Sequence, residues 1–356
     1  MDFSVDDTTA ELTALVRDMG ERLVTDDSLR ELDARFGPGT ESGGTDRDTA
    51  RFHARYWEEL RRAGPPAAPA PESLGGAGLG VIGEALVLRE LGRVVAPVPL
   101  SAAIRAAYLL EAAGRTERAS AAAEGREIAA VGDGWSGSAP EVDWAPIADV
   151  LVQPSADGVS VADRDALTVE RTVPVDFSCA GLVTGDPGPV AEVPTEALEL
   201  DALRRRVHLA AYQWGVIEAA LARTAAYATT RHQFGRPIGT FQAVAARLAD
   251  GSIDVDAVRL STLRAAYELD ACGGAPDATP PSPLASPPFW ACDAGHRLAH
   301  TAVHVHGGVG LDRSEPAHRY FLAAKADEFR LGGATRQLLD LGDVLATAGD
   351  PWEYSA

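Results

Sequence analysis

The order in which two hydrophobic periodicities follow one another along the chain restricts the folds open to it. Over roughly the first 120 residues, apolar side chains recur every three to four positions, which is the spacing of amphipathic helices. Short runs with β propensity replace them between Ile128 and Val183, separated by Asp, Gly and Pro. Helical spacing returns near Glu196. This order predicts an α+β protein with a helical part, a small β part and a second helical part.

The boundaries of the three parts are placed at residues 1–120, 121–196 and 197–356. We expect the first part to be all helical and the second to be a small antiparallel β domain. The third part begins with a long helix that ends near Arg231, and its segment 272–288 holds six prolines, which predict a loop. The other expected helices cover residues 7–32, 48–63, 84–92 and 101–113 in the first part and 241–270, 289–306 and 315–346 in the third.

Charge and composition exclude several classes of function. The chain has 32 Lys and Arg residues against 52 Asp and Glu residues, and its formal net charge of −20 opposes binding to nucleic acid or to an anionic membrane. No apolar run approaches the ~20 residues of a membrane span, and the acidic first residues do not resemble a secretion signal. We therefore expect a cytoplasmic protein without a nucleic-acid or membrane partner.

The histidines and cysteines do not predict a metal site. Cys179, Cys272 and Cys292 are scattered and form no C-x-x-C pair. His300 and His304 share one face of an expected helix, but no carboxylate follows them at the spacing of a zinc motif. We expect these histidines to be ordinary helix residues and the protein to bind no metal.

Two further patterns fit ordinary structure better than chemistry. Residues Gly78–Gly83 match G-x-G-x-x-G, yet a Pro-rich segment precedes them where a dinucleotide-binding fold would have a strand. We expect a tight turn between two helices there. The pair Ser178 and Cys179 lies in a turn that lacks the G-x-S-x-G pattern of a nucleophilic serine.

The stretch from Arg231 to Gln242 is the most informative, because a long helix ends there in a Gly/Pro turn and a new helix begins. Arg231 offers a forked set of donors to a phosphate, Phe234 a flat face, and Gln242 an amide donor and acceptor. The residues by themselves favour a loop salt bridge as the explanation of the arginine at this point. A second glycine cluster, 307–310, follows another expected helix and would let a ligand approach the backbone.

These segments, in their order, resemble the flavin-dependent acyl-CoA dehydrogenases over most of the chain. The resemblance covers three C-terminal motifs and three N-terminal ones. The C-terminal motifs are Y-A-x-x-R-x-Q-F-G-x-P-I-x-x-F-Q at 227–242, L-A-D at 248–250 and H-G-G-x-G at 306–310. The N-terminal motifs are W-E-E-L at 57–60, P-E-x-x-G-G-x-G-L at 71–79 and E-L-G-R at 90–93.

The resemblance implies a helical N-terminal domain, a small β-barrel or sandwich and a C-terminal four-helix bundle. It also implies an FAD shared across a subunit interface, held by Arg231, Phe234 and Gln242 of one subunit, with Gly307 and Gly308 against the same cofactor. The implied substrate is an acyl-CoA or acyl-carrier thioester of lipid or secondary metabolism. The implied assembly is a dimer of dimers, of identical or of homologous chains, that passes electrons to an electron-transfer acceptor.

The glutamate with which the family abstracts a proton from the thioester is not found at either of its usual positions. Counting from Gly307 and Gly308, the first position is Leu331. The alternative position, 26 residues before Arg231, is Arg205. The usual flavin loop of the middle domain is also unrecognisable at 131–138, and a usual glutamine is replaced by His304.

Three functions remain open from the sequence. The chain is either the base-lacking subunit of a heteromeric dehydrogenase that completes a partner's FAD site, a self-sufficient FAD enzyme with a relocated base or altered chemistry, or a non-catalytic homologue. The nearest carboxylates for a relocated base are Glu328 and Glu315, and a solvated helix residue is the ordinary interpretation of Glu328. In so acidic a chain, Arg204–Arg206 and the Arg231 corner also stand out as candidate anion sites.

Overall fold

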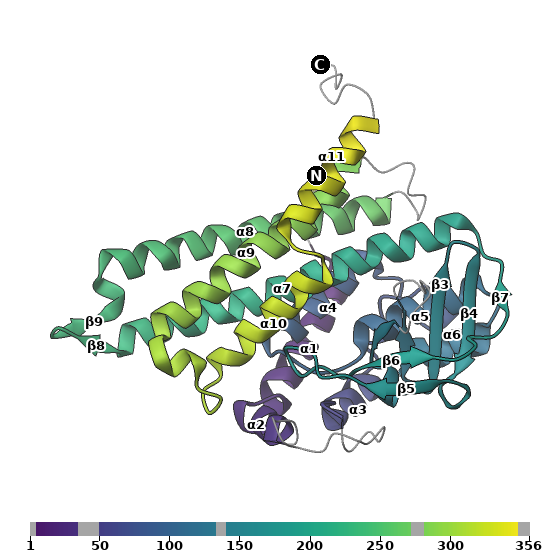
Figure 1. Cartoon of the computed structure of the whole chain (residues 1–356), viewed down its shortest axis with the longest axis horizontal. Helices are drawn as coiled ribbons and strands as arrows, with labels where there is room; N and C mark the ends of the chain where they lie inside the picture. Colours follow the sequence, from purple (N-terminus) through teal and green to yellow (C-terminus); the bar gives the residue numbers. More distant parts are fainter. Residues whose placement is uncertain (1–4, 35–49, 133–139, 272–280, 348–356) are drawn as a thin grey trace. The chain divides into compact units, whose positions relative to one another are not determined.

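The computed structural model of the protein describes residues 5–34, 50–132, 140–271 and 281–347 (Figure 1). The chain divides into two compact units. Unit 1 comprises Met1–Leu91 and Ala96–Arg205, and unit 2 comprises Gly92–Val95 and Arg206–Ala356. The expected order of helices, strands and helices is confirmed, whereas the three domain boundaries stay a prediction. Within the described residues no helix is long and apolar enough to cross a membrane.

The helices of unit 1 expected from residues 7 and 101 begin within one residue of those positions, whereas the helix expected from 48 begins at Ala54 and the helix expected from 84 begins at Gly80. The segment 7–32 forms two helices, because the chain leaves helical geometry at Val24. The G-x-G-x-x-G segment forms a turn that opens a helix, as expected, with Gly78 and Gly80 both at positive φ. The helices are α1 (Asp7–Leu23), α2 (Asp26–Ala34), α3 (Ala54–Ala63), η2 (Glu72–Leu74), α4 (Gly80–Arg93), whose last two residues belong to unit 2, α5 (Leu100–Ala112) and α6 (Thr116–Ala123).

The β part consists of two small sheets. The first has the order β1 (Ala129–Val131), β3 (Val150–Ser155), β4 (Gly158–Asp163) and β7 (Val190–Ala191). The second has the order β2 (Glu141–Asp143), β6 (Ala180–Thr184) and β5 (Thr168–Arg171).

The expectation of a purely antiparallel β domain is wrong for one pair. Strands β1 and β3 are parallel, with Ala129 opposite Val150. A parallel pair needs a crossover connection, and β2 and the 3-10 turn Ala145–Ile147 lie within the chain that connects the two strands. The period-two pattern of a strand does not indicate its direction, so the parallel pairing could not be predicted from it.

The core of unit 1 follows from side chains that alternate along the first sheet. Val150 and Val152 face one way and pack with Leu109 and Leu110 of α5. Leu151, between them, belongs to a second buried cluster with residues of the other sheet. The first sheet therefore lies between the helices α5 and α6 on one face and the second sheet on the other.

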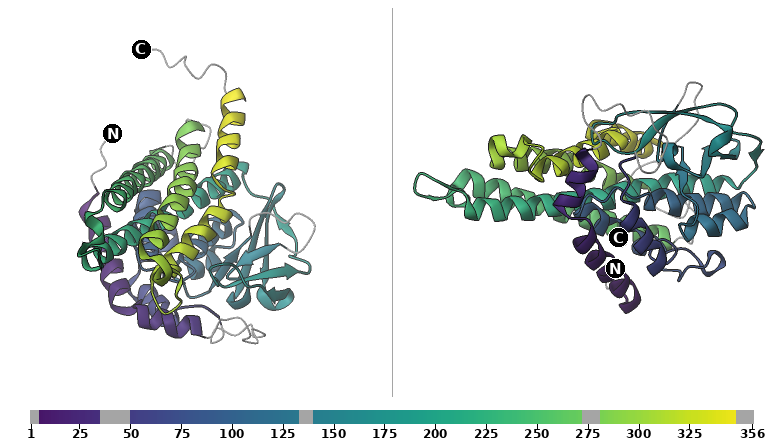
Figure 2. Two further views of the ribbon diagram at one scale, coloured as in Figure 1. Left: turned by 60° about the vertical axis from the view of Figure 1, so that its left-hand side comes forward. Right: turned by 90° about the horizontal axis from the view of Figure 1, so that it is seen from below.

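Unit 2 is helical, and α8 and α10 both pack against α9 (Figure 2). Its helices are α7 (Thr195–Thr230), whose first residues belong to unit 1, α8 (Gln242–Ala271), α9 (Pro281–His306), α10 (Ala317–Arg330) and α11 (Ala334–Thr347). The expected helix 315–346 is two helices, because Gly332 and Gly333 both have φ of 82°.

The expectation of a loop over 272–288 is wrong from Pro281 onward. Helix α9 begins at Pro281, and Pro287 and Pro288 lie inside it. A proline in the first turn, such as Pro281, costs little, because its missing N–H would have no partner in the helix and its fixed φ suits helical geometry. Pro287 and Pro288 lie beyond the first turn, and each lacks the N–H that would bond to the carbonyl four residues earlier. Residues 272–280 lie outside the described part of the chain.

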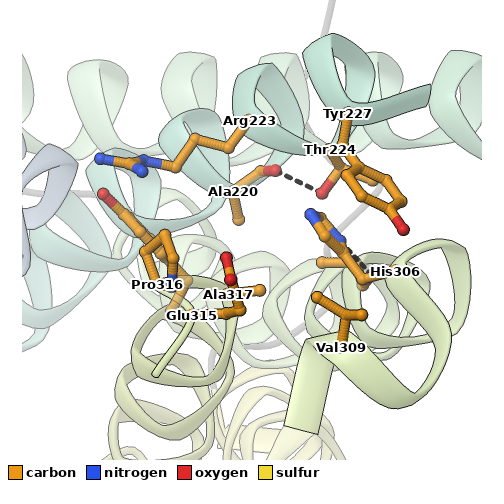
Figure 3. Close-up of a pocket in the computed structure, with 11 residues that line it drawn as sticks. Ala220, Arg223, Thr224, Tyr227, His306, Val309, Glu315, Pro316 and Ala317 are labelled. Atoms are coloured by element: carbon orange, nitrogen blue, oxygen red, sulfur yellow. Dashed lines mark hydrogen bonds between the residues drawn. The ribbon is translucent and has the colours of Figure 1, made fainter. Parts of the chain in front are cut away.

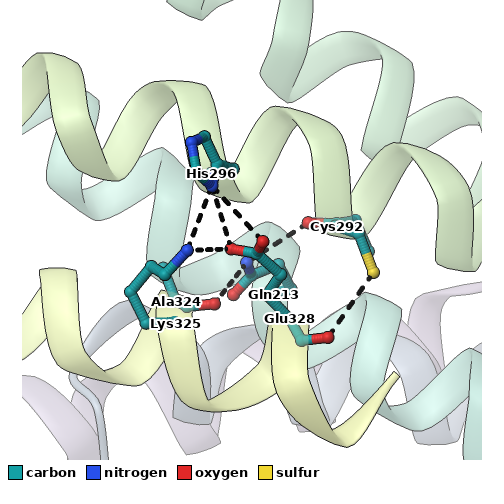
Figure 4. A network of polar contacts seen from close by, with 7 residues as sticks. Gln213, Cys292, His296, Ala324, Lys325 and Glu328 are labelled. Carbon is teal, nitrogen blue, oxygen red and sulfur yellow. Dashed lines mark hydrogen bonds and ion pairs between the residues drawn. The ribbon is translucent and has the colours of Figure 1, made fainter. Parts of the chain in front are cut away.

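A buried glutamine joins three helices of unit 2. The Nε2 of Gln213, on α7, donates to the carbonyl oxygens of Ala291 on α9 and of Ala324 on α10, each at 3.2 Å (Figure 4). The side chain of Gln213 is fully buried. Its amide lies against Gly295, where an added Cβ would be 1.8 Å from Nε2. Gly295 therefore provides the space that this contact requires.

We expect Gly295→Ala to lower the free energy of unfolding by about 1–3 kcal/mol, because the new methyl group displaces a buried amide that has nowhere to move. Gly342→Ala is the matched control, since it also lies within a helix and its Cβ would meet no atom within 4 Å. That substitution should stabilise the protein by about 0.5–1 kcal/mol. Urea unfolding of both variants measures the difference, and equal stabilities would contradict this role of Gly295.

Candidate cofactor-binding site

A tight hairpin follows the end of α7. The Arg231 N–H donates to the Tyr227 carbonyl at 2.9 Å, and the Ile238 N–H donates to the Arg231 carbonyl at 2.8 Å. Two short antiparallel strands, β8 (His232–Gln233) and β9 (Arg236–Pro237), are joined by Phe234 and Gly235. Both joining residues have positive φ, 53° and 80°, as a two-residue turn of this kind demands.

The hairpin presents an aromatic side chain outward. Phe234 is 93% exposed and touches the ring of Phe241 edge-on at 6.1 Å between centroids. The Arg236 guanidinium lies 4.3 Å from the centre of the Phe241 ring on its face. Arg231 and Gln242 are exposed as well. A side chain as apolar as Phe234 gains from being covered by another molecule, so this corner has the character of a contact surface.

The glycine turn after α9 is open to solvent. It forms a short 3-10 helix, η7 (Gly307–Leu311), in which Gly307 has φ of 66°. A Cβ at Gly310 would lie 2.9 Å from the His306 Cβ, so packing within the chain requires that glycine. A Cβ at Gly307 or Gly308 would meet no atom within 4 Å. At Gly308 neither packing nor a positive φ demands a glycine, and the backbone is left accessible to an external group.

The hairpin and the glycine turn are linked by an aromatic stack. The rings of Tyr227 and His306 lie 4.4 Å apart with 21° between their planes. The His306 Nδ1 is 2.8 Å from the Ala302 carbonyl oxygen, to which it donates. A pocket opens beside the stack (Figure 3). It is lined by residues of α7, α9, η7 and α10 and by the segment before α10: Ala220, Arg223, Thr224, Tyr227, Ala302, His306, Val309, Glu315, Pro316, Ala317 and Tyr320.

The residues of this corner suit a pyrophosphate. Arg231 is exposed and supplies a forked cation, which matches the oxygens of a phosphate. Gln242 is the first residue of the 30-residue helix α8, whose N-terminus favours an anion. Phe234 supplies an exposed flat ring beside them. The donor set and the open glycine turn together fit a dinucleotide that approaches from outside the chain.

The two positions at which a catalytic base was sought lie in packed surroundings. Leu331 ends α10 and is 4% exposed. Its carbonyl oxygen accepts a hydrogen bond from the Gln337 side chain. Arg205 is half-buried on α7. Neither position holds a carboxylate, so the described structure places no base there.

Arg204 is not available as an anion ligand, which corrects the candidate cluster Arg204–Arg206. Its Nε lies 3.0 Å from an oxygen of Glu84, and the two side chains are 5% and 0% exposed. The guanidinium also lies 3.8 Å from the centre of the Tyr108 ring. Arg206 donates to the Gln337 side chain at 2.9 Å. The three consecutive arginines therefore do not act as one site.

The carboxylate of Glu328 is engaged by two neighbours (Figure 4). The Lys325 Nζ lies 2.5 Å and the His296 Nδ1 3.2 Å from Oε2, and Oε1 is 3.3 Å from the same histidine nitrogen. Both oxygens thus have partners within unit 2, which disfavours Glu328 as a substrate base. Glu315, the other candidate, is exposed and lines the pocket beside His306.

The two described cysteines are unsuited to nucleophilic chemistry. Burial raises the pKa of the Cys179 thiol to about 12 and that of the Cys292 thiol also to about 12. Both are therefore protonated at neutral pH.

Sequence reasoning missed the Tyr227–His306 stack and the Lys325–His296–Glu328 network. Both form between segments that are distant in sequence, and periodicity does not report such pairs. One feature of the sequence pointed to the stack, because Tyr227 and His306 are the first residues of the motifs at 227–242 and 306–310. Another feature pointed to the network, because Lys325 is the only lysine in the sequence.

Comparison with known families gives two matches. Residues 199–345 match the acyl-CoA dehydrogenase C-terminal domain, and residues 41–120 match the acyl-CoA dehydrogenase N-terminal domain. Among curated relatives, the acyl-CoA dehydrogenase FadE27 of Mycobacterium tuberculosis is 36% identical over 97% of this chain and 99% of its own length. The acyl-CoA dehydrogenase FadE28 of the same organism is 31% identical over 80% of this chain and 91% of its own length.

Two solved structures with similar sequences are described as pairs of chains. The ChsE4–ChsE5 complex from Mycobacterium tuberculosis contains a chain that is 34% identical, with a TM-score of 0.84 over 98% of this chain and 99% of that one. A chain of the Tcur3481–Tcur3483 steroid ACAD G363A variant is 32% identical, with a TM-score of 0.81 over 96% of this chain and 98% of that one. The butyryl-CoA dehydrogenase of Megasphaera elsdenii, at 20% identity and a TM-score of 0.76 over 97% of this chain and all of that one, shares the fold.

Proposed function

Because the chain belongs to the acyl-CoA dehydrogenase family, we propose that it is the base-lacking subunit of a heteromeric acyl-CoA dehydrogenase and completes the FAD site of a homologous partner chain. The observation that carries the proposal is the exposed corner at the end of α7. Phe234 is 93% exposed, with Arg231 and Gln242 exposed beside it, and these side chains face away from the chain that bears them.

Different residues of the corner bind different parts of the cofactor. Arg231 and the N-terminus of α8 neutralise the pyrophosphate, Phe234 packs on an apolar part of the dinucleotide, and the backbone at Gly307 and Gly308 allows close approach. The flavin, when bound, accepts a hydride from the β carbon of the acyl thioester. The part of this chain is to bind and orient the cofactor.

The partner supplies the proton-abstracting carboxylate. Neither Leu331 nor Arg205 can accept a proton from the α carbon, and Glu328 is held by Lys325 and His296. The similar solved chains come from complexes of two named components, which supports a heteromeric assembly. The substrate is a CoA or carrier thioester, and an electron-transfer acceptor reoxidises the flavin.

Purification of the chain alone and together with a homologous acyl-CoA dehydrogenase chain tests the proposal. Alone, the chain is expected to be colourless and to show no dye-linked oxidation of acyl-CoA. Mixed with or co-expressed with the partner, it should form a yellow, active complex whose activity depends on both chains. Size-exclusion chromatography with flavin absorbance measures assembly and cofactor content together.

Two results would contradict the proposal and identify the alternative. A yellow, active preparation of this chain alone, with activity abolished by Glu328→Gln or Glu315→Gln, would establish a self-sufficient enzyme with a relocated base. A chain that stays colourless and inactive with every homologous partner would establish a non-catalytic member.

A further inference from the structure

The glycine turn that contacts the cofactor in the proposed function has little support from its own side chains. Gly307 and Gly308 are exposed, and their Cα atoms face open space. Behind the turn lies the pocket lined by His306 and Val309 on one side and by Thr224 on α7 on the other (Figure 3). Close packing holds Gly310 but not Gly307 and Gly308, so the position of these two residues depends on the contacts of their neighbours in the chain.

One of these contacts is the stack of His306 on Tyr227. The near-parallel rings are 4.4 Å apart, and the hydrogen bond from Nδ1 to the Ala302 carbonyl fixes the orientation of the imidazole. His306 is the last residue of α9 and is bonded directly to Gly307. A displacement of the His306 backbone therefore also displaces the start of the glycine turn.

Tyr227 lies next to the arginine of the proposed cofactor contact. Its carbonyl accepts the hydrogen bond of the Arg231 N–H, which ties Arg231, the residue after α7, to the last turn of that helix. The stack thus joins the helix end that bears the arginine to the helix end that bears the glycines. A dinucleotide that touches both requires them at a fixed separation, and preorganisation of that separation lowers the cost of binding.

We propose that the Tyr227–His306 stack is the positioning element of the cofactor corner, by which we mean Arg231, Phe234, Gln242 and the Gly307–Gly308 turn. The stack holds the Gly307–Gly308 turn at a fixed separation from Arg231. The proposal rests on the proposed function. Neither ring needs to touch the cofactor, since both act through the backbone that they hold.

The test uses the assembled complex with its partner chain and measures FAD affinity by fluorescence titration of the apo complex. His306→Ala is expected to weaken FAD binding about 3- to 10-fold, the range of one aromatic pair. His306→Phe keeps a flat ring on Tyr227 and should restore most of the affinity. Tyr227→Phe keeps the ring and should match the unaltered complex, whereas Tyr227→Ala should behave like His306→Ala.

Control measurements separate positioning from folding. His300→Ala, on the exposed side of the same helix, removes a histidine that contacts Phe321 and should leave FAD affinity unchanged. Melting temperature and partner binding are measured for every variant, and the rescue by His306→Phe shows that loss of fold does not cause the effect. The double variant Tyr227→Ala/His306→Ala should bind FAD no more weakly than either single one.

The outcomes distinguish this inference from the function on which it rests. If His306→Ala and Tyr227→Ala both bind FAD as the unaltered complex does, while Arg231→Ala loses it, the stack is not a positioning element and the proposed function stands. If Arg231→Ala also keeps its full affinity, the cofactor corner itself is refuted. Weaker binding by His306→Ala without rescue by His306→Phe would likewise overturn the role of the ring.

Discussion

Replacing Arg204 by methionine is expected to lower the free energy of unfolding by about 3–5 kcal/mol, because it removes the cation paired with a buried carboxylate. Glu84 has a fully buried side chain, and the Nε of Arg204 lies 3.0 Å from its Oε2. Methionine fills a similar volume, so the loss comes from the charge and its hydrogen bond more than from a cavity. Such a loss is a large part of the stability of an ordinary domain.

Two further variants make the test specific. Glu84→Gln combined with Arg204→Met removes both charges and is expected to recover much of the loss, since no buried ion then lacks its counter-charge. Arg205→Met, one residue along the same helix and only half-buried, should change stability by less than about 1 kcal/mol. Urea unfolding followed by circular dichroism measures all three, and an Arg204→Met protein as stable as the unaltered one would contradict the assignment.

The three consecutive arginines show what the sequence could not tell. Neighbouring residues on a helix point in directions about 100° apart, so Arg204 and Arg206 meet different surroundings. The partner of Arg204 is Glu84, 120 positions away in the chain. In a chain with a net charge of −20, any arginine cluster is a candidate anion site. Arg204, however, is buried and paired with Glu84, so it has a structural role.

Hydrophobic spacing and turn residues predicted those parts of the fold that are determined by neighbouring residues in the chain. Long runs at helical spacing gave α7 and α8 almost to the residue, and the glycine and proline at the end of α7 located the hairpin corner. The same reasoning failed for the parallel pairing of β1 with β3, which depends on contacts between distant segments. It also failed for α9, which contains prolines that local propensity excludes from a helix.

The candidate site was predictable as two separate motifs, not as one arrangement. Arg231, Phe234 and Gln242 were identified with their exposed corner, and Gly307 and Gly308 with their turn. Their proximity follows from the ring contact of Tyr227 with His306, which joins helices whose separation in sequence is about 80 residues. The roles of all five residues toward a cofactor stay predictions.

Arg231→Ala in the assembled complex is expected to weaken FAD binding roughly 10- to 100-fold, the worth of one charge-assisted hydrogen-bonded pair with a phosphate. The effect should appear as flavin lost on gel filtration and as activity restored by excess FAD. The matched control is Arg259→Ala on α8, which removes an equal charge from a residue paired only locally with Asp256. This control should keep its flavin.

The remaining question is whether Arg231 acts through its shape or only through its charge. Arg231→Lys preserves the charge but replaces the planar fork by a point charge, so it should recover only part of the lost affinity if the contact is bidentate. Added salt should weaken FAD binding in the unaltered complex and in Arg231→Lys, and much less in Arg231→Ala, because screening acts on a charge that the alanine variant no longer has. Equal affinity of Arg231→Ala and the unaltered complex at low salt would refute the role of Arg231 and, with it, the view that this chain completes its partner's flavin site.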